Sequence, residues 1–317
     1  MADEPKKDDL DFLKDLGDIP PAPIMKRNRL GMSIQFFVVP ALIVGLIVGI
    51  FLLFRFMTEE TQSVNDLFDR MMNASGRQKA IYADSFVRKL SQERGDYKNP
   101  VPEPLQKMVP QILAAIRGLS GRELSAEEID TKILCIKALG IVGNVDVAPD
   151  LASIIDEEKN EIVQWEGLQT LGALKNPDSL ETLRKYLNHS SPKTRKYAAF
   201  NIGAVRNPAA IPDLKQHLTD ESVEVRWNSA FSLAYFLNDN SGVAVLLQML
   251  DRAHVDKAVD PKEEHRDLFI NHCMSLAAQA VAVIKEKSAI PLLEKAADSD
   301  PSMEVRDACR KALKLIK

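Results

Sequence analysis

A repeat of about 31 residues limits what this 317-residue chain can fold into more than any other feature of its sequence. Four segments align with one another: KALGIVGN, QTLGALKN, FNIGAVRN and FSLAYFLN. Each ends in an asparagine, and successive asparagines are 32, 31 and 31 residues apart. Stacked repeat proteins have a fixed period of roughly 20 to 50 residues. We therefore predict equivalent structural positions at Asn144, Asn176, Asn207 and Asn238.

Each unit is predicted to be a pair of antiparallel helices. Apolar residues recur at three- and four-residue spacing on both sides of the asparagine, so each helix has one stripe to bury. Asn-Pro at 176–177 and 207–208 supplies a capping side chain and then a residue that already has a helical φ. The small residues Gly140, Gly172 and Gly203 are expected to let the two helices of a pair approach near their turn. One pair cannot bury its apolar faces alone, so the pairs must stack.

The units resemble the short HEAT-like repeats of the family named after phycocyanobilin lyase subunits. The clearest unit is 190–220, SSPKTRKYAAFNIGAVRNPAAIPDLKQHLTD, which has an arginine near the start of the first helix, an alanine-rich middle and the motif Asn-Pro-x-Ala-Ile-Pro. The resemblance covers 124–317. It implies an all-α fold, a HEAT-like α-solenoid in which antiparallel helix pairs form a right-handed superhelix.

The resemblance also implies a structural role for the repeated arginine. In that family this arginine belongs to a ladder that links neighbouring repeats, which here implies the same for Arg195, Arg226 and Arg306. The first two units lack the arginine and have Ile133 and Trp165 near its expected place.

The run 32–54, MSIQFFVVPALIVGLIVGIFLLF, contains no charged residue. As a helix, a run of this length can cross the roughly 30 Å of a bilayer's hydrocarbon core. A cleavable signal peptide is the alternative, but no small-x-small cleavage site follows the run. We therefore expect a single transmembrane helix over 30–56, an uncleaved signal anchor of a single-pass protein. Gly45 and Gly49 have the GxxxG spacing through which two such helices can dimerise.

The charges beside this run predict its orientation. Lys26, Arg27 and Arg29 precede it closely, whereas Arg55 alone follows closely. Positive residues favour the cytoplasmic side. We therefore expect a cytoplasmic N-terminus and a repeat domain on the other side of the membrane, which is the periplasm in a bacterium.

Two flanking segments complete the predicted organisation. Residues 1–29 are rich in charge and proline and are expected to be a disordered cytoplasmic tail. Residues 57–123 show helical patterns outside the repeat and are expected to form either a juxtamembrane stalk or an N-terminal cap of the solenoid. The repeat domain is expected at 124–317.

The sequence gives no sign of a catalytic site. The formal net charge of −4 disfavours binding to nucleic acid. Nucleophile, phosphate-binding and dinucleotide-binding motifs are absent, and no His/Cys spacing typical of a metal site occurs. We therefore expect no catalytic, cofactor-binding or metal-binding residues.

The leading hypothesis is a membrane-anchored scaffold that binds a protein partner. The expected surface is the concave face, lined by the second helices, together with an insertion at 252–267, although an ordinary solvated loop is the alternative for the insertion. The alternative function is an enzyme or enzyme subunit of the HEAT-like lyase type that acts on a cofactor or protein substrate. The candidate partner-binding residues are Arg184, Lys185, Lys215, Gln216, His254 and His265.

Overall fold

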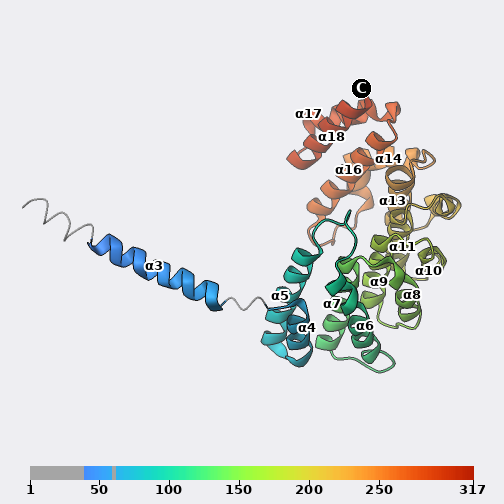
Figure 1. Ribbon diagram of the computed structural model, residues 1–317. Helices are drawn as coiled ribbons and strands as arrows, with labels where there is room; N and C mark the ends of the chain where they lie inside the picture. The colour runs from blue at the N-terminus through green and yellow to red at the C-terminus, as the bar shows by residue number, and fades with distance from the viewer. Residues whose placement is uncertain (1–38, 59–61) are drawn as a thin grey trace, which may run out of the picture. The chain divides into compact units, whose positions relative to one another are not determined.

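The structure is a computed structural model that describes residues 39–58 and 62–317 (Figure 1). The chain forms two compact units, 1–62 and 63–317. The described residues are helices, turns and loops, with no β-strand among them. The predicted tail, 1–29, and the first part of the predicted transmembrane helix lie outside the described residues.

In the first unit, the described element is the helix α3 (Val39–Thr58). Its side chains are described at 40–51 and 53, and the large apolar ones are exposed, from Val48 at 49% to Leu42 at 67%. Among the residues that the structure describes, no helix is both long enough and apolar enough to cross a membrane.

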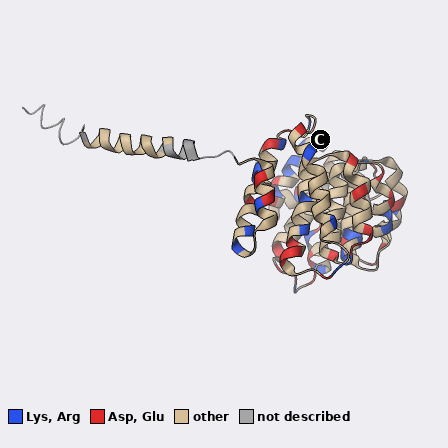
Figure 2. Ribbon diagram, turned by 60° about the horizontal axis from the view of Figure 1, so that its bottom comes forward, with Lys and Arg blue, Asp and Glu red and all other residues tan. Residues whose placement is uncertain are grey.

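The second unit is a stack of helix pairs. It begins with α4 (Val64–Asn73), α5 (Gly76–Arg94) and α6 (Glu103–Gly118). The pairs, each a first and a second helix, are α7 (Ala126–Val142) with α8 (Ala148–Asp156), α9 (Glu161–Leu174) with α10 (Ser179–Leu187), α11 (Pro192–Ala204) with α12 (Ile211–Gln216), α13 (Val223–Phe231) with α14 (Val243–Leu250), and α16 (Arg266–Val283) with α17 (Ile290–Ser299). The inserted helix α15 (Arg252–Ala258) precedes the fifth pair, and α18 (Met303–Ile316) follows it. Acidic and basic residues are interspersed over these helices (Figure 2).

The turn inside the first three pairs has one conformation. A left-handed residue follows the first helix within two residues, with φ of 71°, 55° and 60° at Gly143, Lys175 and Arg206. In each pair the next residue is the repeated asparagine, whose Oδ1 accepts a hydrogen bond from the amide two residues further on at 2.9 to 3.0 Å. This Asx turn satisfies an amide that has no partner within the helix that follows. The asparagines are Asn144, Asn176 and Asn207.

The fourth pair departs from the predicted alignment by one residue. Its first helix continues into a π-helical turn, η5 (Ser232–Phe236), which adds one residue to the unit. Asn238 therefore takes the left-handed position, with φ of 52°, and Asp239 accepts the hydrogen bond from the Ser241 amide at 2.9 Å. The predicted equivalence of Asn238 and Asn207 is wrong because helix winding, which spacing in the sequence does not reveal, sets the phase.

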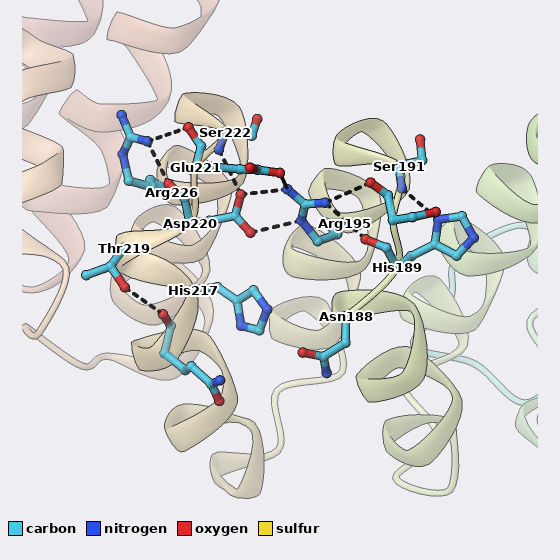
Figure 3. Close-up of polar contacts among 12 residues, drawn as sticks. Asn188, His189, Ser191, Arg195, His217, Thr219, Asp220, Glu221, Ser222 and Arg226 are labelled. Carbon is cyan, nitrogen blue, oxygen red and sulfur yellow. Dashed lines mark hydrogen bonds and ion pairs between the residues drawn. The ribbon is translucent and has the colours of Figure 1, made fainter.

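A ladder of polar contacts joins the units (Figure 3). The Arg195 guanidinium donates through Nη1 to the carbonyls of the fifth and sixth residues before it. Through Nε and Nη2 it donates to Asp220, in the loop that leads to the next unit, both at 2.9 Å. The Arg195 and Asp220 side chains are 9% and 8% exposed. Arg226 and Arg306 donate to the corresponding carbonyls before their own helices.

The first two units contribute Lys132 and Gln164 to the same ladder. Each is eleven residues before the left-handed residue of its turn, as the arginine is in the third unit. The Lys132 ammonium pairs with Glu158, and their side chains are 3% and 10% exposed. Gln164 Nε2 donates to the carbonyl of Glu158 at 2.6 Å. The predicted alignment, which puts Ile133 and Trp165 near this place, is therefore one residue off.

The insertion supplies the ladder contact in the fifth unit, which has no polar residue at the ladder position. In the fifth unit, the buried Met274 stands eleven residues before the left-handed Lys285. Arg252, at the start of α15, instead donates through Nε and Nη2 to Asp300, both at 2.7 Å. The Asp300 side chain is 2% exposed. At least this part of the predicted functional loop therefore has a structural role.

Glycines bring the first helices of successive units close together. A Cβ at Gly172 would lie 2.5 Å from Asn201 Oδ1, and one at Gly203 would lie 2.4 Å from Ser232 Cβ. Asn201 and Ser232 belong to the first helix of the next unit, including its π-helical turn. The expectation that these glycines serve the two helices of one pair is therefore corrected: they serve the stacking of one unit on the next.

This close approach curves the solenoid. The first helices from α7 to α13 are in extensive contact with one another along the array, whereas successive second helices touch sparsely. The first helices consequently line the inner side of the array, and α8 and α10 lie on its outer side (Figure 1). The prediction that the second helices line the concave face is therefore wrong, and the structure reverses that assignment.

The helices α4 to α6 extend the core of the repeats at one end. Phe68 and Phe86 pack with ring centroids 5.4 Å apart, within the same buried cluster as the side chains of α7. Arg94, which is 5% exposed, donates from Nε to the Val142 carbonyl at 2.8 Å. Residues 63–118 thus cover the N-terminal end of the repeats, as a cap does.

Candidate functional site

The predicted partner-binding residues of the second helices are engaged with neighbouring units. Arg184, Lys185 and Lys215 each form an ion pair that connects two successive units. A binding role would require breaking these pairs. The pairs are Arg184–Asp213 at 2.8 Å, Lys185–Asp156 at 2.9 Å and Lys215–Asp239 at 3.1 Å.

The other three predicted residues do not converge on one site. Gln216 is exposed on α12, His254 is exposed on α15, and His265 lies just before α16. His265 Nε2 is 3.7 Å from a carboxylate oxygen of Glu264, and both side chains are largely exposed. Throughout the described part of the chain, no three His, Cys, Asp or Glu side chains are grouped so that they could hold a metal ion.

An aromatic row on the first helices is a stronger candidate. We define it as Trp165, Tyr197, Phe200, Phe231 and Tyr235, from α9, α11, α13 and η5. Trp165 stacks on Tyr197 with ring centroids 5.5 Å apart, Phe200 on Phe231 at 5.9 Å, and Phe231 on Tyr235 at 4.9 Å. Because each of the first two stacks joins successive units, the row runs across the repeats along the inner side.

Polar contacts hold one end of the aromatic row. Trp165 Nε1 donates to Thr194 Oγ1 at 2.9 Å, and the Lys193 ammonium lies 4.0 Å from the centroid of the Trp165 ring system. A cation over the face of an indole is attracted by the ring quadrupole. These contacts fix the orientation of the indole, so that the row has a defined shape.

Next to the row lies an inner-face cavity of about 280 Å³ between α11, α13 and α16. Its walls are mostly aromatic, and its floor contains Met249 of α14 and Cys273, which are 2% and 6% exposed. Burial raises the pKa of the Cys273 thiol to about 12, so this thiol is protonated and apolar in character at neutral pH. The aromatic walls are Tyr197, Phe200, Trp227, Phe231 and Phe269.

The break in the repeat explains why the cavity lies here. The first helices α11 and α13 are in close contact, whereas α13 and α16 touch only sparsely. The helix α16 packs instead on η5 and on α14. No side chain fills the space between α13 and α16. The cavity therefore extends from the inner face to Met249 on α14.

The rim of the cavity is polar but carries no unpaired charge of its own. Lys196 and Glu224, from successive first helices, form an ion pair there. Asn201 and Asn228 each donate a side-chain hydrogen bond to the carbonyl four residues earlier, at 2.8 Å. Neither amide oxygen accepts a hydrogen bond from another described residue. Asn201 is 2% exposed and its Oδ1 packs against Gly172, so the half-buried Asn228 is the one of the two that offers an acceptor to a ligand.

A second ion pair lies on the same face. Burial raises the pKa of Glu166, while Lys137, whose Nζ is 3.5 Å away, opposes that rise. The Glu166 side chain is 14% exposed. The inner face thus combines aromatic rings with paired charges.

The sequence carries a signal for this surface that the predicted sites do not include. Trp165 and Tyr197 are 32 residues apart, and Phe200 and Phe231 are 31 residues apart, so aromatic residues recur in phase with the repeat. The prediction was restricted to polar side chains on the second helices and in the insertion, and it therefore missed these rings on the first helices.

Comparison with known proteins agrees with this architecture. Residues 122–191 and 180–259 match the family of HEAT repeats. This chain carries HEAT-like repeats. The HEAT-like solenoid is similar in structure to a chain from the complex of CpcE and CpcF of phycocyanin lyase from Nostoc sp. PCC7120, with a TM-score of 0.51 and 15% sequence identity over 80% of this chain and 93% of that chain.

Human deoxyhypusine hydroxylase in complex with glycerol is matched with a TM-score of 0.24 and 20% identity, over 76% of this chain and 99% of that chain. No curated protein matches the sequence. Identities this low make the likeness to the lyase chain one of fold.

Proposed function

We propose that this HEAT-like solenoid is a scaffold that binds a segment of a partner protein along its inner face. The observation that carries the proposal is the aromatic row, which crosses successive units and leads into the inner-face cavity. Aromatic side chains, and apolar hollows that they line, dominate the binding energy of protein interfaces. The matched lyase structure is itself a complex of two chains, which supports an interaction role for this fold.

We further propose that residues 32–54 anchor the scaffold in a membrane, with the N-terminus in the cytoplasm and the solenoid on the other side. The uncharged run and the cations before it support this orientation. The exposure of the large apolar side chains of α3 supports an apolar environment around that helix. A Cβ added at Gly45 or Gly49 would meet no atom within 4 Å, so both positions offer the open surface that a second copy of the helix would need for homodimerisation.

Site-specific photocrosslinking tests the binding face. A photoreactive phenylalanine derivative is placed at Gln169 on the inner side or at Gln216 on the outer side of the full chain in its native membrane. We expect a discrete crosslinked protein from position 169 and none from position 216. Capture from position 216 alone would contradict the proposal, because the partner would then contact the second helices.

The alternative function is an enzyme or enzyme subunit of the lyase type. It is favoured by the likeness to the lyase complex and by a cavity whose aromatic walls could hold a ring system. Visible absorbance that co-purifies with the full chain and disappears on filling the cavity would support this alternative. A colourless protein that captures a partner from position 169 would favour the scaffold.

A further inference from the structure

The inner-face cavity has the properties of a site for one apolar side chain. Its floor and walls are buried or half-buried aromatic and sulfur-containing residues, and it opens on the side that the aromatic row also faces. An occupant would cover Met249, Phe231 and Phe269 at once. Filling such a hollow removes apolar surface from water on both partners, which favours binding.

The charges at the cavity limit the kind of chemical group that can bind in it. The two ionised side chains at the cavity, Lys196 and Glu224, already neutralise each other. A charged group placed on the apolar floor would have no partner there and would incur a large desolvation cost. An uncharged ring, in contrast, can stack on the walls, since aromatic pairs gain stability beyond that of their buried area.

The surroundings indicate that this ring belongs to a chain. The aromatic row continues from the cavity toward Trp165 in one direction. In the other direction, Tyr235 borders a second hollow of about 530 Å³ between α16 and α18, where Val283 and Leu315 are exposed. An extended segment can follow this course, and the amide oxygen of the half-buried Asn228 can accept a hydrogen bond from its backbone.

We propose that the inner-face cavity binds an aromatic side chain of an extended partner segment, whose next apolar side chain enters the hollow between α16 and α18. This inference rests on the proposed function and names the chemistry of the partner. Neighbouring helices lie about 8 to 10 Å apart. A segment in the extended polyproline II conformation advances about 3.1 Å per residue and presents every third side chain to the same face. The two apolar residues of the segment are therefore about three positions apart.

A displayed library of random dodecapeptides, selected on the full chain in detergent micelles, tests this. We expect the enriched peptides to share an aromatic residue, with a second apolar residue about three positions away. Replacing the aromatic residue of an enriched synthetic peptide by alanine is expected to weaken its binding at least tenfold. Enrichment of peptides without an aromatic residue would overturn the inference.

Matched variants locate the site. Asn228→Trp fills the inner-face cavity and is expected to weaken binding of the enriched peptide at least tenfold, whereas Gln216→Trp, on the outer side, leaves binding unchanged. Phe269→Ala removes a half-buried wall and should weaken binding as well, with thermal unfolding measured for all three variants. If Asn228→Trp unfolds, Phe269→Ala decides the outcome, and unchanged binding to a folded wall variant overturns the inference.

The crosslinking positions separate the two proposals. A peptide that crosslinks at position 169 yet binds folded Asn228→Trp and Phe269→Ala as tightly as wild type would overturn this inference and leave the proposed function standing. A peptide that crosslinks only at position 216 would overturn both.

Discussion

At the scale of residues, the ladder shows that different side chains can make the same type of contact in successive units. Arg195, Lys132 and Gln164 each reach backward to the loop before their helix, and Arg195 and Lys132 also pair with a carboxylate. A buried carboxylate that loses its cation is left with an uncompensated charge. The ladder residues are therefore expected to be sensitive positions.

Replacing Arg195 by alanine is expected to destabilise the solenoid by about 3 to 5 kcal/mol, since it leaves the buried Asp220 without its cation. Denaturant unfolding of the full chain in micelles measures the loss. Arg226→Ala is the matched control, because the hydrogen bonds of Arg226 go to backbone carbonyls and its side chain is more exposed. Equal losses of unfolding free energy in the two variants would contradict this role of the Arg195–Asp220 ion pair.

The same contact predicts a pH dependence. Burial by itself would raise the pKa of Asp220, but hydrogen bonds from Arg195 and from the Ser222 amide lower the pKa below its ordinary value. A depressed folded-state pKa adds stability above the unfolded-state pKa of about 4, and this stability is lost as the pH falls through the folded-state pKa. Unfolding free energies measured from pH 7 downward should therefore fall below about pH 4, and less steeply in Asp220→Asn.

At the scale of elements, the spacing between first helices decides the shape of the array. Glycines permit a close approach between the first helices α7 to α13, while successive second helices touch only sparsely. The insertion interrupts this regular stacking at α16. The inner-face cavity therefore lies between α13 and α16, where the described first helices depart from regular stacking.

Gly203→Ala is expected to cost about 1 to 3 kcal/mol, because the added Cβ would lie 2.4 Å from Ser232 Cβ and force α11 and α13 apart. Gly118→Ala provides the control, since a Cβ there meets no atom within 4 Å and alanine favours a helix. The thermal unfolding temperatures of the two variants test this difference. A stable Gly203→Ala protein would show that the close approach is not required.

Arg252→Ala is expected to loosen the C-terminal helices, because the buried Asp300 would lose both of its 2.7 Å hydrogen bonds from the guanidinium. Amide hydrogen exchange should become faster in α17 and α18 and stay unchanged in α7 to α10. Lys107→Ala, which removes an exposed ion pair with Glu103 within α6, is the comparison. Uniformly faster exchange along the whole solenoid would argue against a local role for α15.

At the scale of the whole molecule, the proposed anchor would limit where the inner face can meet a partner. A scaffold held by 32–54 reaches only segments that approach the membrane surface. Tethering also raises the effective concentration of a partner in the same membrane. A weak contact at the inner-face cavity would then be sufficient for association.

The full chain is expected to stay in the membrane fraction after extraction with alkaline carbonate. Deleting 32–54 is expected to release the protein from the membranes. Replacing Lys26, Arg27 and Arg29 by glutamate should instead change which side the solenoid occupies, as measured by its accessibility to added protease in sealed vesicles. A deletion variant that still sediments with membranes would contradict anchoring by this segment.

The helix pairs and their turns are local features, and the sequence alone determined them. Apolar spacing specifies a helix within a few residues, and an asparagine after a left-handed residue needs only its own neighbours to form the turn at 143–146, 175–178 and 206–209. For the same reason the repeat period, and with it the solenoid, could be read directly from the chain.

Contacts between units were decided only by the tertiary structure. Lys132 and Gln164 share the place of Arg195 although their side chains differ, and the π-helical turn at Ser232–Phe236 moves Asn238 out of phase. The inner side and its cavity depend on how closely Gly172 and Gly203 admit a helix from the next unit. Such contacts join residues about 30 positions apart, so they follow from packing in three dimensions and not from local sequence pattern.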